Sequence, residues 1–451
     1  MSFHTFKHKI KLNINQIIAL AFFCIIAFGS IMLALPFATK GDCHDSILTP
    51  LFTATSAVCV TGLSIVDIWT NYTFGGQLII LLLMEIGGLG FMSVVSILIY
   101  VSKHYIDISS LSLMAETIGS DTLGNIARIQ KRLILGSLLF ESIGAAILSV
   151  CFIKTLGFPK ALWFAIFHSV SAFCNAGFDL MGFISPGSGM EVFQNNPLVL
   201  ITISILIVVG GIGFVVWDDI VSSKHIRDWS IYSKLVLITT FTLIAIGFVF
   251  FMFSEFNNAC SVGNLTLNNK IVNCLFQSVT TRTAGFASIN QASFTDSSKA
   301  LTIILMIIGG STGSTAGGIK TVTFIIIISS ILSSLFGKKN TIVLGRRLSA
   351  DQIIHAYTIA GSFVFLSLLG SYVMYITSNV TFFESIFESV SALATVGLSL
   401  GITGSLSHIS QLVLIILMYI GRVGLLTLTV GFFKAKNNAS IKYPSVKLLN
   451  G

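Results

Sequence analysis

The sequence predicts an all-α polytopic membrane protein with eight transmembrane helices and four re-entrant pore helices. These form four tandem helix–pore-loop–helix repeats around a central pore. Three observations predict this fold: an apolar composition, alternating long and short apolar segments, and two glycine patterns that recur in phase. Of 451 residues, 54% are hydrophobic and 10% are charged, whereas soluble proteins carry about 25% charged residues. The composition excludes an ordinary soluble enzyme, a disordered chain and a coiled coil, because lipid must solvate such a surface.

Long and short apolar segments alternate along the chain. Eight stretches are long enough to cross a bilayer, which takes about 20 helical residues each. They are 17–37, 76–101, 133–153, 198–217, 233–254, 300–333, 353–376 and 409–433. A segment too short to cross lies within each successive pair. These four segments are 47–58, 161–173, 271–281 and 382–394.

The first glycine pattern ends the short segments. Each segment carries a Phe near its start and a glycine turn at its end, and the third copy is one residue shorter between the two. The turn glycines are Gly62, Gly177, Gly285 and Gly397, separated by 115, 108 and 112 residues. A period near 110 residues is too long for a solenoid repeat and fits two crossings with a re-entrant hairpin between them.

The second glycine pattern lies in the second long stretch of each unit. Its four copies are Gly87-Gly88-Leu-Gly90, Gly210-Gly211-Ile-Gly213, Gly309-Gly310-Ser-Thr-Gly313 and Gly421-Arg422-Val-Gly424. The third copy continues to Lys320, with five glycines in ten residues, each costing a helix about 1 kcal/mol. We therefore predict a broken helix beneath the turns, with a packing kink as the alternative. A phosphate-binding loop is disfavoured because the G-K-[ST] ending is absent.

This broken segment is a candidate gate, because small residues there can obstruct a pore and move at little steric cost. A central arginine in the fourth unit must be paired or hydrated, so we expect it to face the pore or to hydrogen-bond to carbonyls of this segment. The predicted gate residues are Gly309, Gly310, Ser311, Thr312, Gly313, Ser314, Thr315, Ala316, Gly317, Gly318, Lys320 and Arg422.

The turns after the short segments are the candidate ion site. Non-helical backbone at membrane depth must be buried in protein or line a water-filled cavity, so the four turns have to converge. Rings of backbone carbonyls can replace the hydration shell of K⁺, and the turns contain no acidic side chain that would indicate a calcium-type filter. The predicted filter residues are Val60, Thr61, Gly62, Asn175, Ala176, Gly177, Thr283, Ala284, Gly285, Thr395, Val396 and Gly397. K⁺ is expected at the carbonyls of Thr61, Asn175, Thr283 and Thr395; simple helix caps are the alternative.

Basic residues indicate the orientation. With the N-terminus inside, 18 of the 26 Lys and Arg residues fall in inner stretches, as the positive-inside rule requires. Five fall in outer stretches, namely Lys40, Lys154, Lys160, Lys270 and Lys299. The predicted layout is a cytoplasmic N-terminus (1–16), repeat 1 (17–101), a cytoplasmic loop (102–132), repeat 2 (133–217), a loop (218–232), repeat 3 (233–335) with a gating loop (309–320), a loop (336–352), repeat 4 (353–435) and a cytoplasmic tail (436–451).

Further charged residues are expected at membrane depth, each with a structural and a functional interpretation. Arg282 is expected to hold the third turn by pairing with an acid or with carbonyls, and Lys320 either acts near the gate or snorkels to the inner interface. The roles of Glu85, Glu141 and Glu388 stay open between ion coupling and hydrogen bonding to neighbouring backbone.

The four repeats and their T-G-L, N-A-G-F, T-A-G-F and T-V-G-L turns resemble the Trk, Ktr and plant HKT potassium transporter superfamily. The resemblance spans about residues 15–450. The absence of a helix pair before the first repeat and the ending Ile441-Lys-Tyr-Pro444 are most similar to the Ktr membrane subunit. In that family the matching glycines line the selectivity filter, and a serine at the first is associated with Na⁺-preferring members. Glycine at all four positions therefore implies K⁺.

The resemblance implies a K⁺-uptake protein, not an enzyme, with K⁺ as the transported ion, Na⁺ as an activator and no covalently bound cofactor. The alternative is a Na⁺- or H⁺-coupled secondary transporter of potassium. The implied partners are a second copy of the chain, with 443–451 as candidate contact, and a cytosolic ATP/ADP-binding RCK-type ring like KtrA or KtrC. The implied location is the bacterial plasma membrane, multi-pass, with both termini cytoplasmic. Nucleic-acid binding is not expected, because no basic run is paired with aromatic residues.

Overall fold

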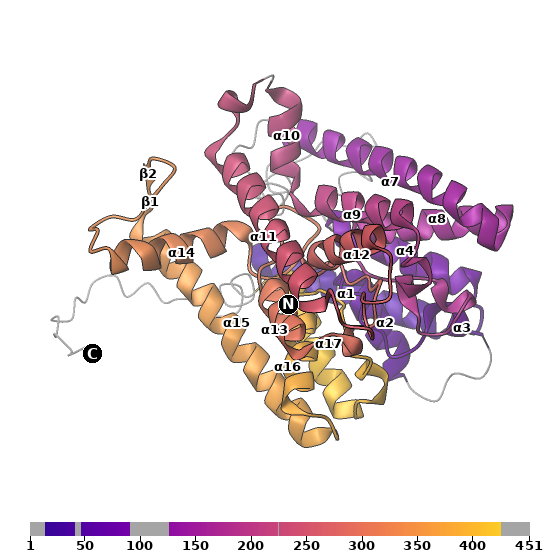
Figure 1. Ribbon diagram of the computed structural model, residues 1–451. Coiled ribbons are helices and arrows are strands. Elements are labelled where there is room, and N and C mark those ends of the chain that lie inside the picture. Colours follow the sequence, from indigo (N-terminus) through magenta and orange to yellow (C-terminus); the bar gives the residue numbers. More distant parts are fainter. Residues whose placement is uncertain (1–13, 41–46, 91–125, 224, 425–451) are drawn as a thin grey trace, which may run out of the picture.

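The computed structural model describes residues 14–40, 47–90, 126–223 and 225–424. These ranges are mostly helical (Figure 1). The long helices are α1 (Ile14–Ala34), α7 (Ile126–Leu156), α11 (Ile231–Glu255) and α15 (Ala350–Thr377). The four short helices that follow them are α2 (Leu48–Val58), α8 (Phe158–Phe173), α12 (Leu267–Thr280) and α16 (Phe382–Leu393). The remaining α-helices are α3 (Ile68–Asn71), α4 (Phe74–Leu89), α9 (Pro197–Gly211), α10 (Phe214–Ser222), α13 (Asp296–Ile307), α14 (Thr321–Leu335) and α17 (His408–Val423).

Each short helix packs most extensively against the long helix before it. The phenylalanine shared by the four predicted repeats is completely buried in every copy, at Phe52, Phe167, Phe276 and Phe387. These rings belong to one continuous core at the centre of the molecule, while α7 and α15 run along its edge (Figure 1). The prediction of four short helices is confirmed by this arrangement.

The long helices present apolar side chains outward. Phe28, Phe253 and Phe365 are 64%, 86% and 65% exposed, and such surfaces are stable only against lipid. Within the described ranges, four helices are long and apolar enough to cross a membrane, and the bent pair α9–α10 is a fifth candidate. The shorter apolar helices α4, α14 and α17 do not reach that length, so the expected count of eight full spans is not reproduced by length alone.

In three of the second long stretches, the last glycine of the second pattern interrupts the helix. Gly90, Gly213 and Gly424 have φ values of 83°, 91° and 94°, a region that glycine enters readily and other residues do not. The prediction of a continuous helix over 198–217 is therefore wrong, because the chain bends by 91° between α9 and α10. The predicted 76–101 and 409–433 helices end at Leu89 and Val423, and their remaining residues lie outside the described ranges, apart from Gly90 and Gly424.

Helix starts follow local capping chemistry. Thr381 and Glu384 form a reciprocal capping box at α16, and Ser349 and Gln352 form another at α15. The Thr73 side chain accepts from Gly76 N–H at the start of α4. Such side chains satisfy backbone N–H groups that have no partner in the first turn.

The all-α prediction needs one small correction. A two-stranded antiparallel hairpin, β1 (Ile342–Val343) and β2 (Arg346–Arg347), lies between α14 and α15 and projects from the left side of the molecule in Figure 1. Both turn residues, Leu344 and Gly345, have positive φ values of 45° and 78°. This geometry matches the right-handed twist of the flanking strands.

Candidate functional site: a ring of four turns and a loop beneath it

The turn after each short helix repeats one backbone pattern. Its first residue is left-handed, and a glycine with positive φ follows two residues later. The pairs are Val60 (56°) and Gly62 (89°), Asn175 (58°) and Gly177 (70°), Thr283 (65°) and Gly285 (79°), and Thr395 (51°) and Gly397 (95°). Left-handed non-glycine residues are strained and cluster at functional sites, and here the strain recurs at four matching positions.

These backbone angles correct the register of the predicted carbonyl set. The predicted set takes residues from two different positions of the turns, because Val60, and not Thr61, has the left-handed conformation of Asn175. We call the position of the left-handed residue the first level and the position after it the second level. The four first-level residues are Val60, Asn175, Thr283 and Thr395, and the second-level residues are Thr61, Ala176, Ala284 and Val396.

The four glycines form a closed ring in chain order. A Cβ added to Gly62 would lie 2.5 Å from the carbonyl oxygen of Ala176, and one on Gly177 would lie 2.7 Å from that of Ala284. The same distances are 2.4 Å from Gly285 to Val396 and 2.1 Å from Gly397 back to Thr61. Each turn therefore abuts the next, and no side chain larger than hydrogen fits at these positions.

A hydroxyl four residues after each shared Phe holds each turn. Ser56 and Ser391 accept from the N–H groups of Gly62 and Gly397, both at 3.1 Å. In the other two repeats the hydroxyls donate instead. Ser171 donates to Phe178 O at 2.8 Å and Thr280 to Phe286 O at 2.7 Å. Sequence reasoning missed these residues, although the Ser or Thr is visible at the same offset in all four aligned segments.

The third copy has one residue fewer between its Phe and its Gly, and a tighter hydrogen bond at the end of the short helix compensates for the difference. In the other three repeats the N–H of the residue before the glycine bonds to a carbonyl five residues back, as from Thr61 to Ser56 at 2.8 Å. In the third repeat Ala284 N–H bonds only four residues back, to Thr280 O at 3.0 Å. The tighter cap lets a shorter segment deliver its glycine to the same ring.

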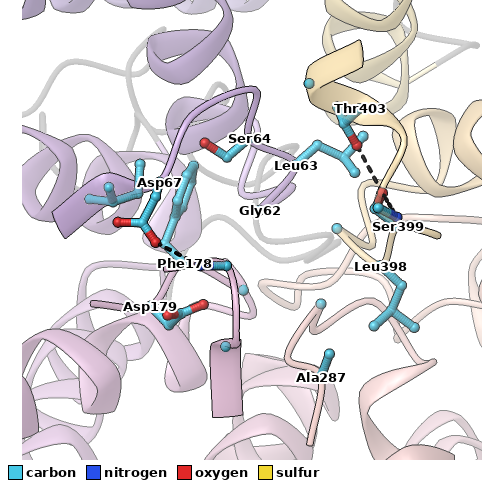
Figure 2. Close-up of a pocket in the computed structure, with 18 of the residues that line it drawn as sticks. Gly62, Leu63, Ser64, Asp67, Phe178, Asp179, Ala287, Leu398, Ser399 and Thr403 are labelled. Carbon is cyan, nitrogen blue, oxygen red and sulfur yellow. Dashed lines mark hydrogen bonds between the residues drawn. The ribbon is translucent and has the colours of Figure 1, made fainter. Parts of the chain in front are cut away.

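A vestibule opens beyond the ring on the side where the chain leaves the turns. It is a cavity of about 440 Å³ bordered by all four glycines and by the residues after them. Figure 2 shows Asp67 and Asp179 together on one side and Leu398, Ser399 and Thr403 on the other. Burial raises the pKa of Asp179 to about 6, and nearby Asp67 adds to the shift. The vestibule therefore carries an asymmetric negative charge from Asp67, Asp179 and Glu191.

The second glycine pattern lets helices pack directly under the short helices. A Cβ on Gly87, Gly210 or Gly421 would lie 2.2, 2.0 or 2.0 Å from the last carbonyl oxygen of the short helix in its own repeat. Those oxygens belong to Val58, Phe173 and Leu393. In the third repeat the corresponding glycine, Gly309, is joined to the turn by a side chain, because Arg282 Nη2 donates to Gly309 O at 2.9 Å. Arg282 thus pairs with a carbonyl, one of the two options expected for it.

The broken segment of the third repeat is a closed loop between α13 and α14. Its ends are joined by bonds from Gly309 N–H to Ile319 O and from Ile319 N–H to Ile307 O, both 3.0 Å. Its middle reaches the second repeat, where Thr315 Oγ1 donates to Phe173 O at 3.2 Å. It also touches the fourth turn, because a Cβ on Gly317 would lie 2.0 Å from Thr395 Oγ1. The loop therefore lies against the first level of the turns, on the side opposite the vestibule.

Two cations hold the loop. Arg422 on α17 donates to Thr315 O at 2.6 Å, and its other terminal nitrogen donates to Gly87 O of the first repeat. Lys320 Nζ donates to Ala316 O at 2.6 Å, so Lys320 folds onto the loop instead of snorkelling to the interface. Arg422 thereby joins residues of the first, third and fourth repeats.

The buried acids fall into two groups. Glu388 accepts from the hydroxyls of Ser399 and Thr403 and so holds the strand after the fourth turn. Glu85, Glu141 and Cys174 come together with one possible ligand atom each within 4.8 Å of one another. The sequence shows no ligand spacing for such a cluster, because three separate helices bring its members together.

Strained turns converging between lipid-exposed helices define a class of protein: a helical membrane protein with a polar vestibule above four converging turns. The comparisons specify the class further. Residues 3–443 match the TrkH cation transport protein family model, and the chain belongs to this family. It is 36% identical to the potassium/sodium uptake protein NtpJ of Enterococcus hirae, over 98% of both chains. It is also 36% identical to Ktr system potassium uptake protein B of Bacillus subtilis, over 97% of this chain and 96% of that one.

Among solved structures, the potassium transporter TrkH from Vibrio parahaemolyticus has the same fold. The TM-score is 0.74, with 95% of this chain and 86% of that chain covered, at 18% sequence identity. The similarity extends over nearly the whole chain, so the shared fold is not confined to one part of it.

Proposed function

We propose that this chain is a K⁺-uptake protein whose four turns form a selectivity filter and whose glycine-rich loop is the gate. The observation that carries the proposal is the closed ring of Gly62, Gly177, Gly285 and Gly397, each against a carbonyl of the next repeat. The proposal includes the predicted layout of eight membrane crossings in four repeats. The named relatives, described as potassium uptake proteins, support the choice of ion.

The backbone supplies the ligands in this proposal. Alternating left- and right-handed residues turn successive carbonyls to the same side of a strand, so that four turns give stacked oxygen rings that replace water around K⁺. The hydroxyls of Thr283 and Thr395 are buried and have no protein partner among the described residues, and they provide further oxygens at the inner end. The C-terminal ends of the short helices add partial negative charge.

The loop supplies the barrier. It lies against Thr395 and is held by Arg422, so a cation leaving the turns meets both a steric block and a positive charge. Opening requires that the loop leave its carbonyl contacts with the second and fourth repeats. Once it is open, a membrane potential favours entry by about 2.3 kcal/mol per 100 mV for each K⁺.

The proposed assembly is a homodimer with an RCK-type nucleotide-binding ring on the inner face. Relatives named as parts of a Ktr system support a separate regulatory subunit. The candidate dimer contact at 443–451 lies outside the described residues. The proposed location is the bacterial plasma membrane with both termini in the cytoplasm, as the distribution of basic residues predicts.

The test is Rb⁺ flux into liposomes that contain the purified full-length protein, with and without Na⁺ and a cytosolic ring. We expect voltage-driven Rb⁺ entry and a K⁺ preference over Na⁺ that falls at least about tenfold in Gly62→Ser and Gly285→Ser, a loss of about 1.4 kcal/mol. Gly361→Ser is the matched control, since Gly361 has open space around it. Absence of Rb⁺ entry, or unchanged preference in both filter variants, would overturn the proposal.

Coupled transport is the second candidate, favoured by the buried carboxylates Glu85 and Glu141 and by the relative named for potassium and sodium uptake. With the membrane voltage held at zero, an imposed Na⁺ or proton gradient would drive Rb⁺ accumulation only if transport is coupled. Rb⁺ that follows its own gradient regardless of the second ion would exclude this candidate.

A further inference from the structure

A second cavity of about 310 Å³ lies beside the vestibule, between the first and second repeats. Its walls come from the segment after α1, from α3 and α4, and from the start of α8. The residues that matter are Lys40, Trp69, Phe74, Gln77, Lys160 and Trp163. Trp69 follows directly after Asp67 and Ile68, which border the vestibule, so both cavities lie on the same face of the molecule.

Two lysines line this cavity, although basic residues are rare on this face of the molecule. Only five basic residues lie on this face in the predicted layout, and two of them meet here. Lys40 Nζ lies 4.3 Å from the ring centre of Trp69 and donates to Trp69 O. Lys160 Nζ lies 4.2 Å from the ring centre of Phe183. Within the described ranges neither ammonium group forms an ion pair with a carboxylate, so both can bind an anion.

The remaining walls suit the boundary between lipid headgroups and acyl chains. Trp163 Nε1 donates to Gln77 Oε1 at 2.9 Å, and its ring lies 4.5 Å from that of Phe74. Phe74 and neighbouring Phe158 are 61% and 69% exposed. Tryptophan and lysine at such a level are typical of the membrane interface, and basic pockets between membrane helices bind lipid headgroups.

We propose that this cavity binds an anionic phospholipid from the leaflet on the vestibule side. Its phosphate lies between Lys40 and Lys160, and an acyl chain follows the rings of Phe74 and Trp163. The two cations, which form no ion pair within the described ranges, fit a lipid together with the aromatic walls and the exposed apolar rim better than they fit a peptide or a free anion. Because Trp69 directly follows Asp67 and Ile68, which border the vestibule, a bound lipid also packs beside the wall of the vestibule.

Tryptophan fluorescence gives a direct test, because two of the four tryptophans line the cavity. The full-length protein is reconstituted in mixtures of ordinary lipid with dibrominated phosphatidylglycerol or dibrominated phosphatidylcholine, whose bromine quenches nearby tryptophan. We expect phosphatidylglycerol to be preferred roughly tenfold or more. The ratio of phosphatidylglycerol binding to phosphatidylcholine binding should fall toward one in the double variant Lys40→Gln/Lys160→Gln. It should fall partly in Lys160→Gln alone.

Lys270→Gln is the matched control, because Lys270 is on the same predicted face and lies 4.4 Å from the ring centre of Phe256. It should keep the preference of the unmodified protein, and inorganic phosphate should not compete. Equal quenching by both lipids would overturn the proposal, as would a preference retained in a double variant that keeps its far-UV circular dichroism. A preference lost equally in Lys270→Gln would indicate general surface attraction, and competition by phosphate would indicate a site for free anions; either outcome contradicts a lipid site.

Discussion

At the scale of single residues, the glycines are explained by specific carbonyl oxygens. The four turn glycines face the next repeat, whereas Gly87, Gly210 and Gly421 face the end of a short helix. Glycine is needed at these positions because an added methyl group would collide with backbone atoms, and backbone cannot avoid the collision by changing a side-chain rotamer. The strain at Val60, Asn175, Thr283 and Thr395 is tolerated because the surrounding helices determine the turns.

Gly397→Ala should therefore abolish K⁺ preference or reduce Rb⁺ flux more than about tenfold. The new Cβ would lie 2.1 Å from Thr61 O at a residue with φ of +95°, and that conformation alone costs about 1–3 kcal/mol. Flux and thermal unfolding are measured together. Gly361→Ala, in the exposed side of α15, is expected to keep flux and to gain up to about 1 kcal/mol of stability. Normal selectivity in Gly397→Ala would contradict the ring.

Asp179 should make uptake at low K⁺ sensitive to pH. Its pKa is raised to about 6 by burial, so the carboxyl is charged above that pH and neutral below it. Lowering the pH on the vestibule side from 7 to 5 removes negative charge near the entrance and should lower flux about two- to threefold. Asp179→Asn should show the low flux at both pH values.

Asp296→Asn is the control for that experiment, since Asp296 is exposed and pairs only with Lys299 in the described structure. It should keep the pH response of the unmodified protein. An unchanged response in Asp179→Asn would assign the titration to another group.

At the scale of elements, the second helix of each repeat is interrupted at the same place. Gly90 and Gly424 end α4 and α17, and Gly213 separates α9 from α10 with nearly the same backbone angles. The third repeat extends the same interruption into a loop. The proposed gate is thus an enlarged version of an interruption that all four repeats share. Arg422 occupies the position next to Gly421, where the first and second repeats carry Gly88 and Gly211.

Arg422→Gln should raise Rb⁺ flux several-fold in the absence of a regulatory partner. The substitution removes donors to Thr315 O and Gly87 O, each charge-assisted bond contributing about 1.5–3 kcal/mol. Arg132→Gln, which breaks an ion pair with Asp218 away from the loop, should leave flux unchanged. A folded Arg422→Gln protein with lower flux would show that the arginine promotes conduction.

At the scale of the whole molecule, orientation can be measured with a natural probe. Cys260, between α11 and α12, is an exposed free thiol on the predicted outer side, and Lys339 lies on the predicted inner side. A membrane-impermeant maleimide should label Cys260 in intact cells. In a Cys260→Ser background, Lys339→Cys should be labelled only after permeabilisation. The reverse pattern would invert the predicted topology.

Much of the architecture was predictable because it is repeated. Hydropathy marked the four short helices, and the in-phase glycines marked the turns, since steric demands at a four-fold interface leave the same residue in every copy. The bend at Gly213 was not predicted, because apolar residues continue across it and hydropathy does not record backbone angle. The cluster of Glu85, Glu141 and Cys174 was also hidden, because its members are separated by many residues and meet only when α4, α7 and α8 pack.

The sequence by itself determined the membrane environment, the four-fold repetition, the turn glycines and the break in the third unit. These follow from solvation and from the backbone freedom of glycine, both of which are local properties. Only the tertiary structure decided that the ring closes from Gly397 to Gly62 and that Arg422 joins the loop to the first repeat. Such relations depend on contacts between distant segments, and spacing along the chain does not encode them.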